Sequence, residues 1–363
     1  MNNFFKEIEQ LINANINYNV IEHYHESKFP KNAWDFMMNE VVSSIDYNDL
    51  DGAAICNIFE AIGYSSKDGG LNFAMGAQTL AATIPFWIYA SNEQKEKYFN
   101  QLKNGKLICA NAITEPEAGS DIFSMKTSAV KSNNGYTLNG LKTFCSNIKE
   151  ADLAIVYAIT DKEKAIAGGI SAFIIEKSQF KVGQTYTKMG LRTCSIGELI
   201  LENSSAQLLG NEGIGLSIFT TAMDWERIGL SAIYLGTMQR LFEQSLSYAK
   251  TRTQNGKQIG SNQAISHKIA AMKTTIHTCR LMIYNAAKKL GKERAVSELA
   301  SMCKLYVSES YIKVCQDAIQ IHGGNGYMEE YEIERCLRDA QASTIYSGTS
   351  EIQKNIIAKW NGL

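Results

Sequence analysis

The sequence is poor in proline and histidine and carries almost no net charge. Three prolines and five histidines occur among 363 residues, and the formal net charge is −1. So few prolines are compatible with long helices, although Pro85 lies in an apolar helical segment that it is expected to kink or end. The balanced charge gives no electrostatic case for nucleic acid or an anionic membrane as a partner.

Long apolar runs are also missing. No stretch of about twenty apolar residues occurs, so no membrane span is expected. The start, Met1-Asn-Asn-Phe-Phe-Lys-Glu-Ile, lacks the apolar core and cleavage site of a signal peptide. We therefore expect a cytoplasmic protein. With 45% apolar and 20% charged residues, the chain is typical of a globular protein with two or three packed parts.

The eight cysteines include no Cys-x-x-Cys pair. Most of them lie in apolar segments, which indicates buried free thiols in a reducing compartment rather than disulfides or metal ligands. His23 and His25 flank Tyr24, and His267 and His277 are ten residues apart on one helical segment, too far to share an ion. The sequence therefore predicts no metal site.

Hydrophobic spacing divides the chain into three regions. Residues 1–106 show apolar residues three and four apart, which is typical of helices. Residues 107–209 contain short runs of β-branched and aromatic residues, with a hairpin signal at Asn133-Asn134-Gly135. Residues 210–363 return to a helical pattern. We predict an α+β, mainly α fold with an N-terminal helical domain, a middle β-barrel-like domain and a C-terminal four-helix bundle, bounded as above.

The expected elements can be stated by range. The strands are expected at residues 107–113, 137–145, 153–159, 170–175 and 199–201. The four bundle helices are expected at residues 216–250, 262–290, 294–321 and 345–360.

A turn motif follows the first expected strand. In Thr114-Glu-Pro-Glu-Ala-Gly-Ser-Asp121, the proline and glycine force a turn that offers backbone groups and hydroxyls to a ligand; a plain polar loop is the alternative. The segment resembles the Thr-Glu-Pro-Gly-Ala-Gly-Ser-Asp motif of the acyl-CoA dehydrogenase family, flavoproteins that desaturate acyl thioesters; only Glu117 departs. The resemblance implies that Ile113 and Thr114 contact the flavin ring and that Ser120 lies near the thioester or pantetheine chain.

A second segment, Lys142-Thr-Phe-Cys-Ser-Asn147, resembles the family's Lys-x-Trp-Ile-Thr-Asn. Phe144 stands where a tryptophan packs against the flavin ring, and Ser146 stands where a threonine hydroxyl bonds flavin N5. Both replacements keep an aromatic plane and a hydroxyl donor. Without the resemblance, a strand-end phenylalanine is more often a core residue.

Two helical segments resemble the family's surface for the ADP half of FAD. Arg252-Thr-Gln-Asn-Gly precedes Gln263 by the family's spacing, and a guanidinium suits a diphosphate, although a loop arginine is often merely solvated. In the family, which is typically tetrameric, this arginine reaches the flavin of a neighbouring subunit. The resemblance further implies that Gln320, Gly323 and Gly324 contact the ADP half, where missing side chains permit close approach.

The C-terminal signature, Ala340 to Glu351, departs from the family at one decisive position. In many members the residue between the tyrosine and the glycine is the glutamate that removes the substrate α-proton, but here it is Ser347. The resemblance implies that Ser347 lies beside the substrate. Thr349 and Glu351 stand at positions that contact the flavin. A serine hydroxyl without a partner base is too weak to remove this proton.

Glu226 is the candidate for the missing base. Met223-Asp-Trp-Glu-Arg resembles the pattern of isovaleryl-CoA dehydrogenase-like members, which carry the glutamate just before an arginine on another helix. Independently, Glu226 falls in a stripe with Phe219, Met223 and Leu230, so it faces the core or a pocket. The alternative is a structural glutamate paired with Arg227 or a helix end. The resemblance implies that Asp224 and Arg227 contact the substrate or its pantetheine arm.

The resemblance implies an FAD-dependent α,β-dehydrogenation of an acyl thioester of CoA or of a carrier protein, including prolyl groups. Glu226 would accept the α-proton while hydride moves to flavin N5. Electron-transfer flavoprotein or oxygen would be the acceptor, and a homotetramer or homodimer the assembly. Two alternatives stay open: a flavin oxidase or monooxygenase acting on a non-thioester substrate, and a flavin-binding partner without turnover.

Overall fold

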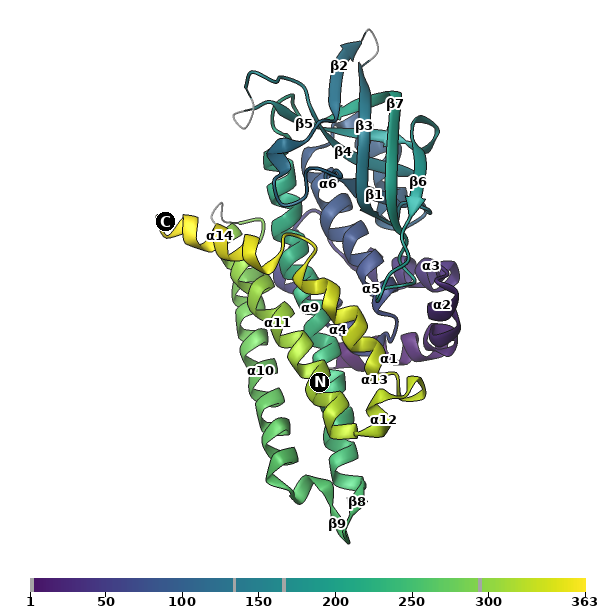
Figure 1. Cartoon of the computed structure of the whole chain (residues 1–363). Coiled ribbons are helices and arrows are strands. Elements are labelled where there is room, and N and C mark those ends of the chain that lie inside the picture. The colour runs from purple at the N-terminus through teal and green to yellow at the C-terminus, as the bar shows by residue number, and fades with distance from the viewer. Residues whose placement is uncertain (1–2, 133–134, 165–167, 293–295) are drawn as a thin grey trace.

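The structure is a computed structural model that describes residues 3–132, 135–164, 168–292 and 296–363. Helices from both ends of the chain pack together, and the sheet formed by the middle of the chain lies at one end of them (Figure 1). This arrangement is the mainly helical α+β fold that the sequence predicts. Within the described residues, no helix has both the length and the apolar character that a membrane crossing requires.

The N-terminal helices pack against the first long helix of the C-terminal part, α9 (Gly215–Thr251). α4 (Gly52–Ser65) approaches α9 closely because glycines meet at the crossing: a Cβ on Gly236 would lie 2.0 Å from the Glu60 carbonyl oxygen. The other N-terminal helices are α1 (Asn3–Asn15), α2 (Val20–Glu26), α3 (Lys31–Glu40), α5 (Gly69–Gly76), α6 (Ile84–Tyr89), α7 (Asn92–Gln94) and α8 (Asn100–Lys103).

Pro85 distorts its helix without ending it. α5 runs through a π-helical segment, Ala77–Thr83, directly into α6. Pro85 has no N–H to donate to the Ala81 carbonyl four residues earlier, and a widened turn accommodates that loss. The Asn111 side-chain amide donates to this carbonyl instead, at 3.2 Å.

The middle of the chain forms a closed sheet. Its strands are β1 (Cys109–Ala112), β2 (Ser128–Ser132), β3 (Gly135–Ser146), β4 (Leu153–Ile159), β5 (Ile170–Glu176), β6 (Lys181–Thr185) and β7 (Ile196–Leu209). Pairings of β4 with β2, β2 with β3, β3 with β7, β7 with β5 and β5 with β4 complete a ring, with β1 and β6 attached to β4 and β7. Such closure removes exposed strand edges and produces the barrel-like part.

The five expected strands are present, but the sequence missed β2 and β6 and underestimated β7. β7 continues from residue 196 to residue 209, although its exposed half lacks a continuous apolar pattern. In the expected hairpin, Ser132 pairs with Gly135 in antiparallel register. Asn133 and Asn134, which carry the hairpin signal, lie outside the described residues.

The C-terminal part is built on three long helices, α9, α10 (Gln263–Ala287) and α11 (Ser297–His322). A two-stranded ribbon, β8 (Thr253–Gln254) and β9 (Lys257–Gln258), lies between α9 and α10. The short helices α12 (Gly324–Tyr327), α13 (Ile333–Gln341) and α14 (Ser350–Trp360) follow. α14 begins five residues later than expected because Ser347 and Gly348 have φ of 56° and 89°, which an α-helix does not accept.

All eight cysteines are free and buried, as the sequence indicates. They lie in both the helical and the sheet parts of the molecule, and no disulfide joins any two of them. Burial raises the pKa of several thiols; that of Cys109 in β1 and of Cys145 in β3 is raised to about 12.

Tyr24 on α2 joins the three regions of the chain. Its hydroxyl lies 3.2 Å from the Met189 carbonyl oxygen, which it can donate to, and 3.3 Å from the Asp339 carboxylate of α13. Arg338 donates to the same hydroxyl at 3.0 Å, and the Leu191 N–H donates to Asp339 at 2.6 Å. Because Tyr24 and Asp339 are buried, the bonds between them and to Leu191 are shielded from water and hold the helices against the segment before β7.

We expect Tyr24→Phe to lower the free energy of unfolding by about 1–2 kcal/mol, because it removes a buried hydroxyl that is shared by three polar partners, among them the buried Asp339 carboxylate. Guanidinium unfolding of the holoprotein measures this change. Tyr306→Phe, at an exposed position of α11, is the matched control and should change stability little. Equal losses for the two variants would contradict this account of the junction.

Candidate active site

Glu226 lies in the middle of α9, where all residues from 222 to 238 are buried. The residue is 7% exposed. Burial raises the pKa of its carboxyl from 4.5 to about 7, although the Ser347 hydroxyl and the charges of Arg227 and Lys304 pull it down. The carboxyl is therefore poised to hold or release a proton near neutral pH, which a general base requires.

A clamped backbone turn lies beside Glu226. Arg227 Nε donates to the Ser347 carbonyl oxygen at 3.0 Å. Gln353 Nε2 donates to the same oxygen at 3.1 Å and to the Gly348 carbonyl oxygen at 2.8 Å. These donors fix both carbonyls, so the turn keeps its left-handed conformation.

The Ser347 side chain is close to Glu226 but incompletely bonded. Its hydroxyl lowers the pKa of the Glu226 carboxyl, yet it is buried and has no hydrogen bond of ordinary length and angle. Ser347 therefore supplies a donor beside the carboxylate rather than a second acid. The preceding residue, Tyr346, shares a short hydrogen bond with the Tyr234 hydroxyl of α9 and packs against the Phe73 ring at 4.6 Å.

Asp224 and Arg227, the predicted substrate residues, are both buried on α9. Asp224 Oδ2 accepts a hydrogen bond from Ser297 Oγ at 2.7 Å, Oδ1 has no partner, and burial raises the pKa of this carboxyl. Lys304 of α11 adds a second buried cation near Arg227; burial lowers the pKa of its amine to about 8. The charges in this region are thus nearly all desolvated.

The two predicted flavin segments of the sheet lie side by side. The Thr143 N–H donates to the Thr114 carbonyl oxygen at 2.9 Å, and buried Lys142 donates to the Ile113 carbonyl oxygen at 3.0 Å and to Glu115 at 2.8 Å. Ser146 ends β3 and is partly exposed, as are Ile113 and Thr114. Ser120 is exposed in the following turn.

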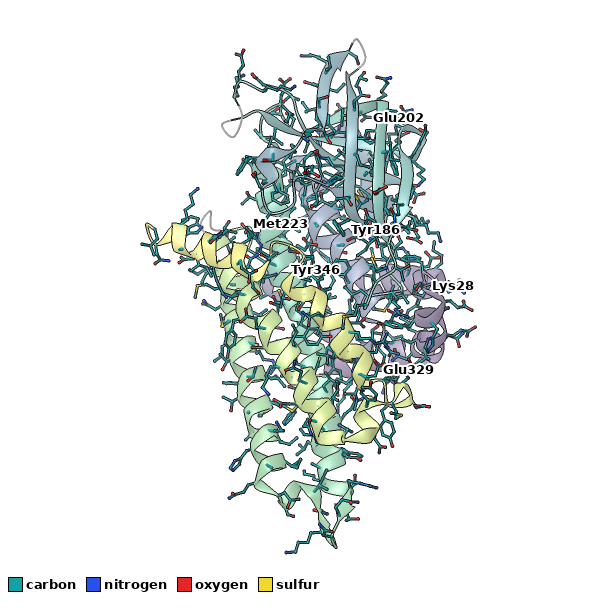
Figure 2. All side chains as sticks on the ribbon, viewed as in Figure 1. Lys28, Tyr186, Glu202, Met223, Glu329 and Tyr346 are labelled. Carbon is teal, nitrogen blue, oxygen red and sulfur yellow. The ribbon has the colours of Figure 1, made fainter. Side chains whose placement is uncertain are left out.

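Phe144 is 65% exposed and has a φ of 54°, although it lies within β3. Its ring packs against Tyr186 with centroids 5.1 Å apart. Figure 2 shows Tyr186, Met223 and Tyr346 at the level where the sheet meets the helices. An outward-facing phenylalanine in this conformation is unlike a core residue and presents an open aromatic surface.

The predicted ADP residues gather elsewhere, at the far end of the helices. Arg252 follows the end of α9, Gln263 begins α10, and Gln320, Gly323 and Gly324 lie at the end of α11. A stacked Tyr248–His322 pair, with ring centroids 4.3 Å apart, joins the ends of α9 and α11. At 1.5 Å per residue, the end of α9 lies roughly 38 Å along the helix from Glu226.

Thr349 and Glu351 occupy the start of α14. Thr349 is the N-cap, and its hydroxyl accepts a hydrogen bond from the Ile352 N–H at 3.3 Å. Glu351 is exposed. Thr349 thus has a structural task that the sequence analysis did not foresee.

The residues fit a flavin in two respects. Phe144 and Ile345, which is 60% exposed, leave large apolar side chains open beside hydroxyls and backbone groups. At the far end, a Cβ added to Gly323 or Gly324 would meet no atom within 4 Å, so the backbone there is open to close approach. These two groups lie at opposite ends of the long helices, one where the sheet meets α9 and the other where α9 and α11 end.

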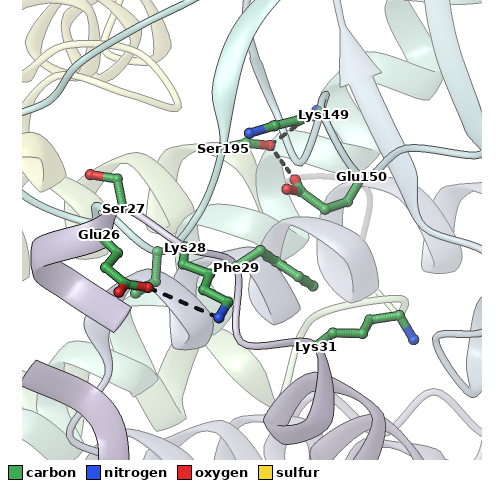
Figure 3. A pocket seen from close by; sticks show the side chains of 9 residues that line it. Glu26, Ser27, Lys28, Phe29, Lys31, Lys149, Glu150 and Ser195 are labelled. Atoms are coloured by element: carbon green, nitrogen blue, oxygen red, sulfur yellow. Dashed lines mark hydrogen bonds and ion pairs between the residues drawn. The ribbon is translucent and has the colours of Figure 1, made fainter. Parts of the chain in front are cut away.

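The larger cavity of the molecule lies away from Glu226. It measures ≈ 510 Å³ and lies between the α2–α3 connection and the turn after β3, where Ser195 donates to Glu150 (Figure 3). None of the predicted site residues lines it. A second cavity of ≈ 20 Å³ lies beyond Tyr346, lined by residues that include Phe73, Leu230 and Tyr234.

Sequence reasoning missed Tyr234, Lys304 and Gln353. A signal existed for Lys304, which interrupts the apolar stripe of Ala300, Val307 and Tyr311. No pattern singles out Gln353, because its function in the clamp depends on a turn that the chain adopts six residues earlier.

Comparisons with known proteins identify the family. Residues 110–204 match the acyl-CoA dehydrogenase middle domain, and residues 213–361 match the acyl-CoA dehydrogenase C-terminal domain. An L-prolyl-[peptidyl-carrier protein] dehydrogenase from a Serratia species is 39% identical over 336 residues, 91% of this chain and 87% of that protein. The chain belongs to the acyl-CoA dehydrogenase family.

Solved structures agree. The prolyl acyl carrier protein oxidase AnaB superposes with a TM-score of 0.95 at 40% identity, covering 99% of this chain and 98% of AnaB. PigA, solved with FAD and proline, gives a TM-score of 0.93 at 34% identity, covering 100% of this chain and 98% of PigA. These similarities extend over the helical and the sheet parts together.

Glu226→Gln is expected to stabilise the protein near pH 8 but not near pH 5. The folded carboxyl has a pKa of about 7 against 4.5 unperturbed, so folding favours its protonated form. The stability from this proton is present below the unfolded pKa and lost as pH rises through about 7, a change of about 3 kcal/mol. Denaturant unfolding of parent and variant at the two pH values measures it.

The control for this titration is Glu22→Gln, at an exposed position of α2. This variant removes an exposed carboxylate instead of a buried one. Its effect on the free energy of unfolding should therefore not differ between the two pH values as that of Glu226→Gln does. A stability difference for Glu226→Gln that is the same at both pH values would show that this carboxyl is not desolvated.

Proposed function

We propose that the protein is an FAD-dependent dehydrogenase that oxidises the α,β-bond of an acyl thioester, with Glu226 as the α-proton acceptor. The observation that carries this assignment is the buried Glu226 carboxyl, with a pKa of about 7, beside the clamped turn at Ser347. The turn is the position from which many relatives supply the base, and here α9 supplies it instead.

The chain's own groups account for the proton and for the carbonyl. Glu226, held among buried neighbours, accepts the α-proton, and the nearby Ser347 hydroxyl and Arg227 stabilise the negative charge when it is ionised. The backbone N–H groups of the turn at Ser347, whose carbonyls are held by Arg227 and Gln353, are proposed to bind the thioester oxygen. Bound FAD would supply the acceptor for the hydride that leaves the β-carbon.

The cofactor would be shared between two copies of the chain. In this proposal Phe144, Ile113, Thr114 and Ser146 hold the ring, and the ADP half lies on Arg252, Gln320, Gly323 and Gly324 of a second copy. The roughly 38 Å between Glu226 and the end of α9 supports this division, because one FAD cannot reach that far. At least a homodimer follows.

The substrate is proposed to be a short acyl or aminoacyl group, delivered on CoA or on a carrier protein. The ≈ 20 Å³ cavity beyond Tyr346 leaves little room for a long chain past Glu226, because Phe73, Leu230 and Tyr234 fill that direction. Two relatives act on carrier-bound prolyl groups by their names, which favours an aminoacyl thioester.

A second candidate is an oxidase that returns electrons directly to oxygen, since AnaB is named an oxidase. Oxygen uptake during turnover separates it from a dehydrogenase that needs electron-transfer flavoprotein. Rapid uptake in the absence of any added acceptor supports the oxidase, and turnover only with the flavoprotein supports the dehydrogenase.

Anaerobic addition of L-prolyl or short acyl thioesters should bleach the bound FAD of the parent, and Glu226→Gln should lower the bleaching rate at least about 10³-fold. Retention of FAD by the variant excludes a loss of cofactor as the cause. Glu298→Gln, a carboxyl at the start of α11 outside this site, is the control. Undiminished bleaching in Glu226→Gln would remove this residue from the mechanism.

Mixing two inactive variants tests the shared cofactor. Glu226→Gln lacks the base and Arg252→Ala lacks the diphosphate contact, so each alone should be inactive or poor in FAD. Co-expressed and randomly paired, they should regain about one quarter of the parent activity, because half of the pairs then contain one intact site of two. An absence of recovery in mixed assemblies would show that each copy holds its own cofactor.

A further inference from the structure

Two buried oxygen atoms of the sheet, on the side that meets α9, have no hydrogen-bond partner. They are Oδ1 of Asn111 in β1 and the hydroxyl of Tyr157 in β4. The strands are neighbours in parallel register, with Asn111 opposite Ile155, two residues before Tyr157. The Tyr157 ring meets Phe219 of α9 edge-on, with centroids 5.6 Å apart, so the pair lies where the sheet meets the helix that carries Glu226.

The orientation of the Asn111 side chain is determined by its neighbours. Its amide nitrogen donates to the Ala81 carbonyl oxygen at 3.2 Å, the carbonyl that lacks a donor because Pro85 follows four residues later. A carbonyl only accepts, so the nitrogen must face Ala81 and the oxygen must face away from it. Asn111 is also only partly buried, so its side chain borders open space.

Tyr157 and Glu226 face the same region. Burial is the main reason why the pKa of the Tyr157 phenol is raised, and the charges of Cys109, Glu226 and Tyr89 add to it. The Asn111 carboxamide lowers the same pKa, although the two side chains make no bond of ordinary geometry. Asn111 and Tyr157 thus form a pair on neighbouring strands, and the Phe219 contact places this pair against α9, the helix that carries Glu226.

The residues around this cluster are small and apolar. Ala81 and Ala222 pack with Met223 in a cluster of their own, separate from the three larger cores. A purely hydrocarbon acyl group placed here would leave both oxygen atoms unpaired, at a cost of about 1–3 kcal/mol each. A group with N–H donors would satisfy them.

We propose that Asn111 and Tyr157 bind the amine of an aminoacyl thioester. This inference rests on the proposed function and names the substrate class: thioesters with an amine on the α-carbon. The amine is bonded to the carbon that loses its proton to Glu226, so its acceptors must lie beside that carboxyl. A protonated secondary amine carries two N–H donors, matching the two unpaired oxygen atoms.

The test compares two substrates on the same pantetheine thiol, L-prolyl and cyclopentanecarbonyl, which differ by one N–H in place of a methylene. The holoenzyme should favour the prolyl thioester roughly tenfold or more in kcat/KM, because a site built for hydrogen bonds rejects an analogue that lacks them. Asn111→Leu and Tyr157→Phe should bring this ratio toward one. Asn139→Leu, on an exposed part of β3, should leave the ratio unchanged.

Tyr157→Phe removes one oxygen atom without changing shape, so it remains decisive if Asn111→Leu does not fold. Equal kcat/KM values for the two thioesters in the parent, or an unchanged ratio in Tyr157→Phe, would overturn this inference and leave the dehydrogenase intact. Bleaching of FAD by no thioester of any kind would instead overturn the proposed function.

Discussion

The burial of one carboxyl in the middle of α9 is the constraint on which the rest of the site depends. α9 is enclosed on all sides over residues 222–238, because α4, α10 and α11 pack around it and glycines bring α4 within backbone contact. An acid in such a place loses its hydration, and its proton affinity rises into the neutral range. The same packing that builds the core therefore makes Glu226 chemically useful.

Neighbouring residues on α9 divide two tasks. Glu226 is the proposed base, while Arg227, one residue on and about 100° around the helix, holds the Ser347 carbonyl. In the proposed mechanism the base lies on the helix and not in the turn. The turn then only holds its backbone conformation, to which Gln353 contributes by bonding the Ser347 and Gly348 carbonyls. The turn has this left-handed shape although Ser347 stands where many family members have a glutamate.

The sequence was sufficient to predict the architecture and the burial of Glu226. Periodicity identified the helices and five of the strands, and the stripe through Glu226 correctly put it in the interior. The residues expected to contact the ADP half lie near one another, at the ends of α9 and α11, but their distance of roughly 38 Å along α9 from Glu226 follows only from the length of that helix. Local patterns do not report distances between elements.

What the sequence could not reveal depends on contacts between distant segments. Gln353 bonds a turn whose left-handed shape has no signature other than Gly348, and Asn111 is oriented by a carbonyl that Pro85 leaves free. The strands β2 and β6 have weak apolar patterns because their pairing with β3 and β7, and not side-chain burial, holds them.

The eight hidden thiols have a practical consequence. Five lie in helices, two in strands and one in the segment before β7, and none is open to a reagent while the chain stays folded. A thiol-reactive dye can therefore label the molecule only as fast as it opens. The labelling rate therefore reports unfolding, and the cysteines of the sheet and of the helices report it separately for the two parts of the molecule.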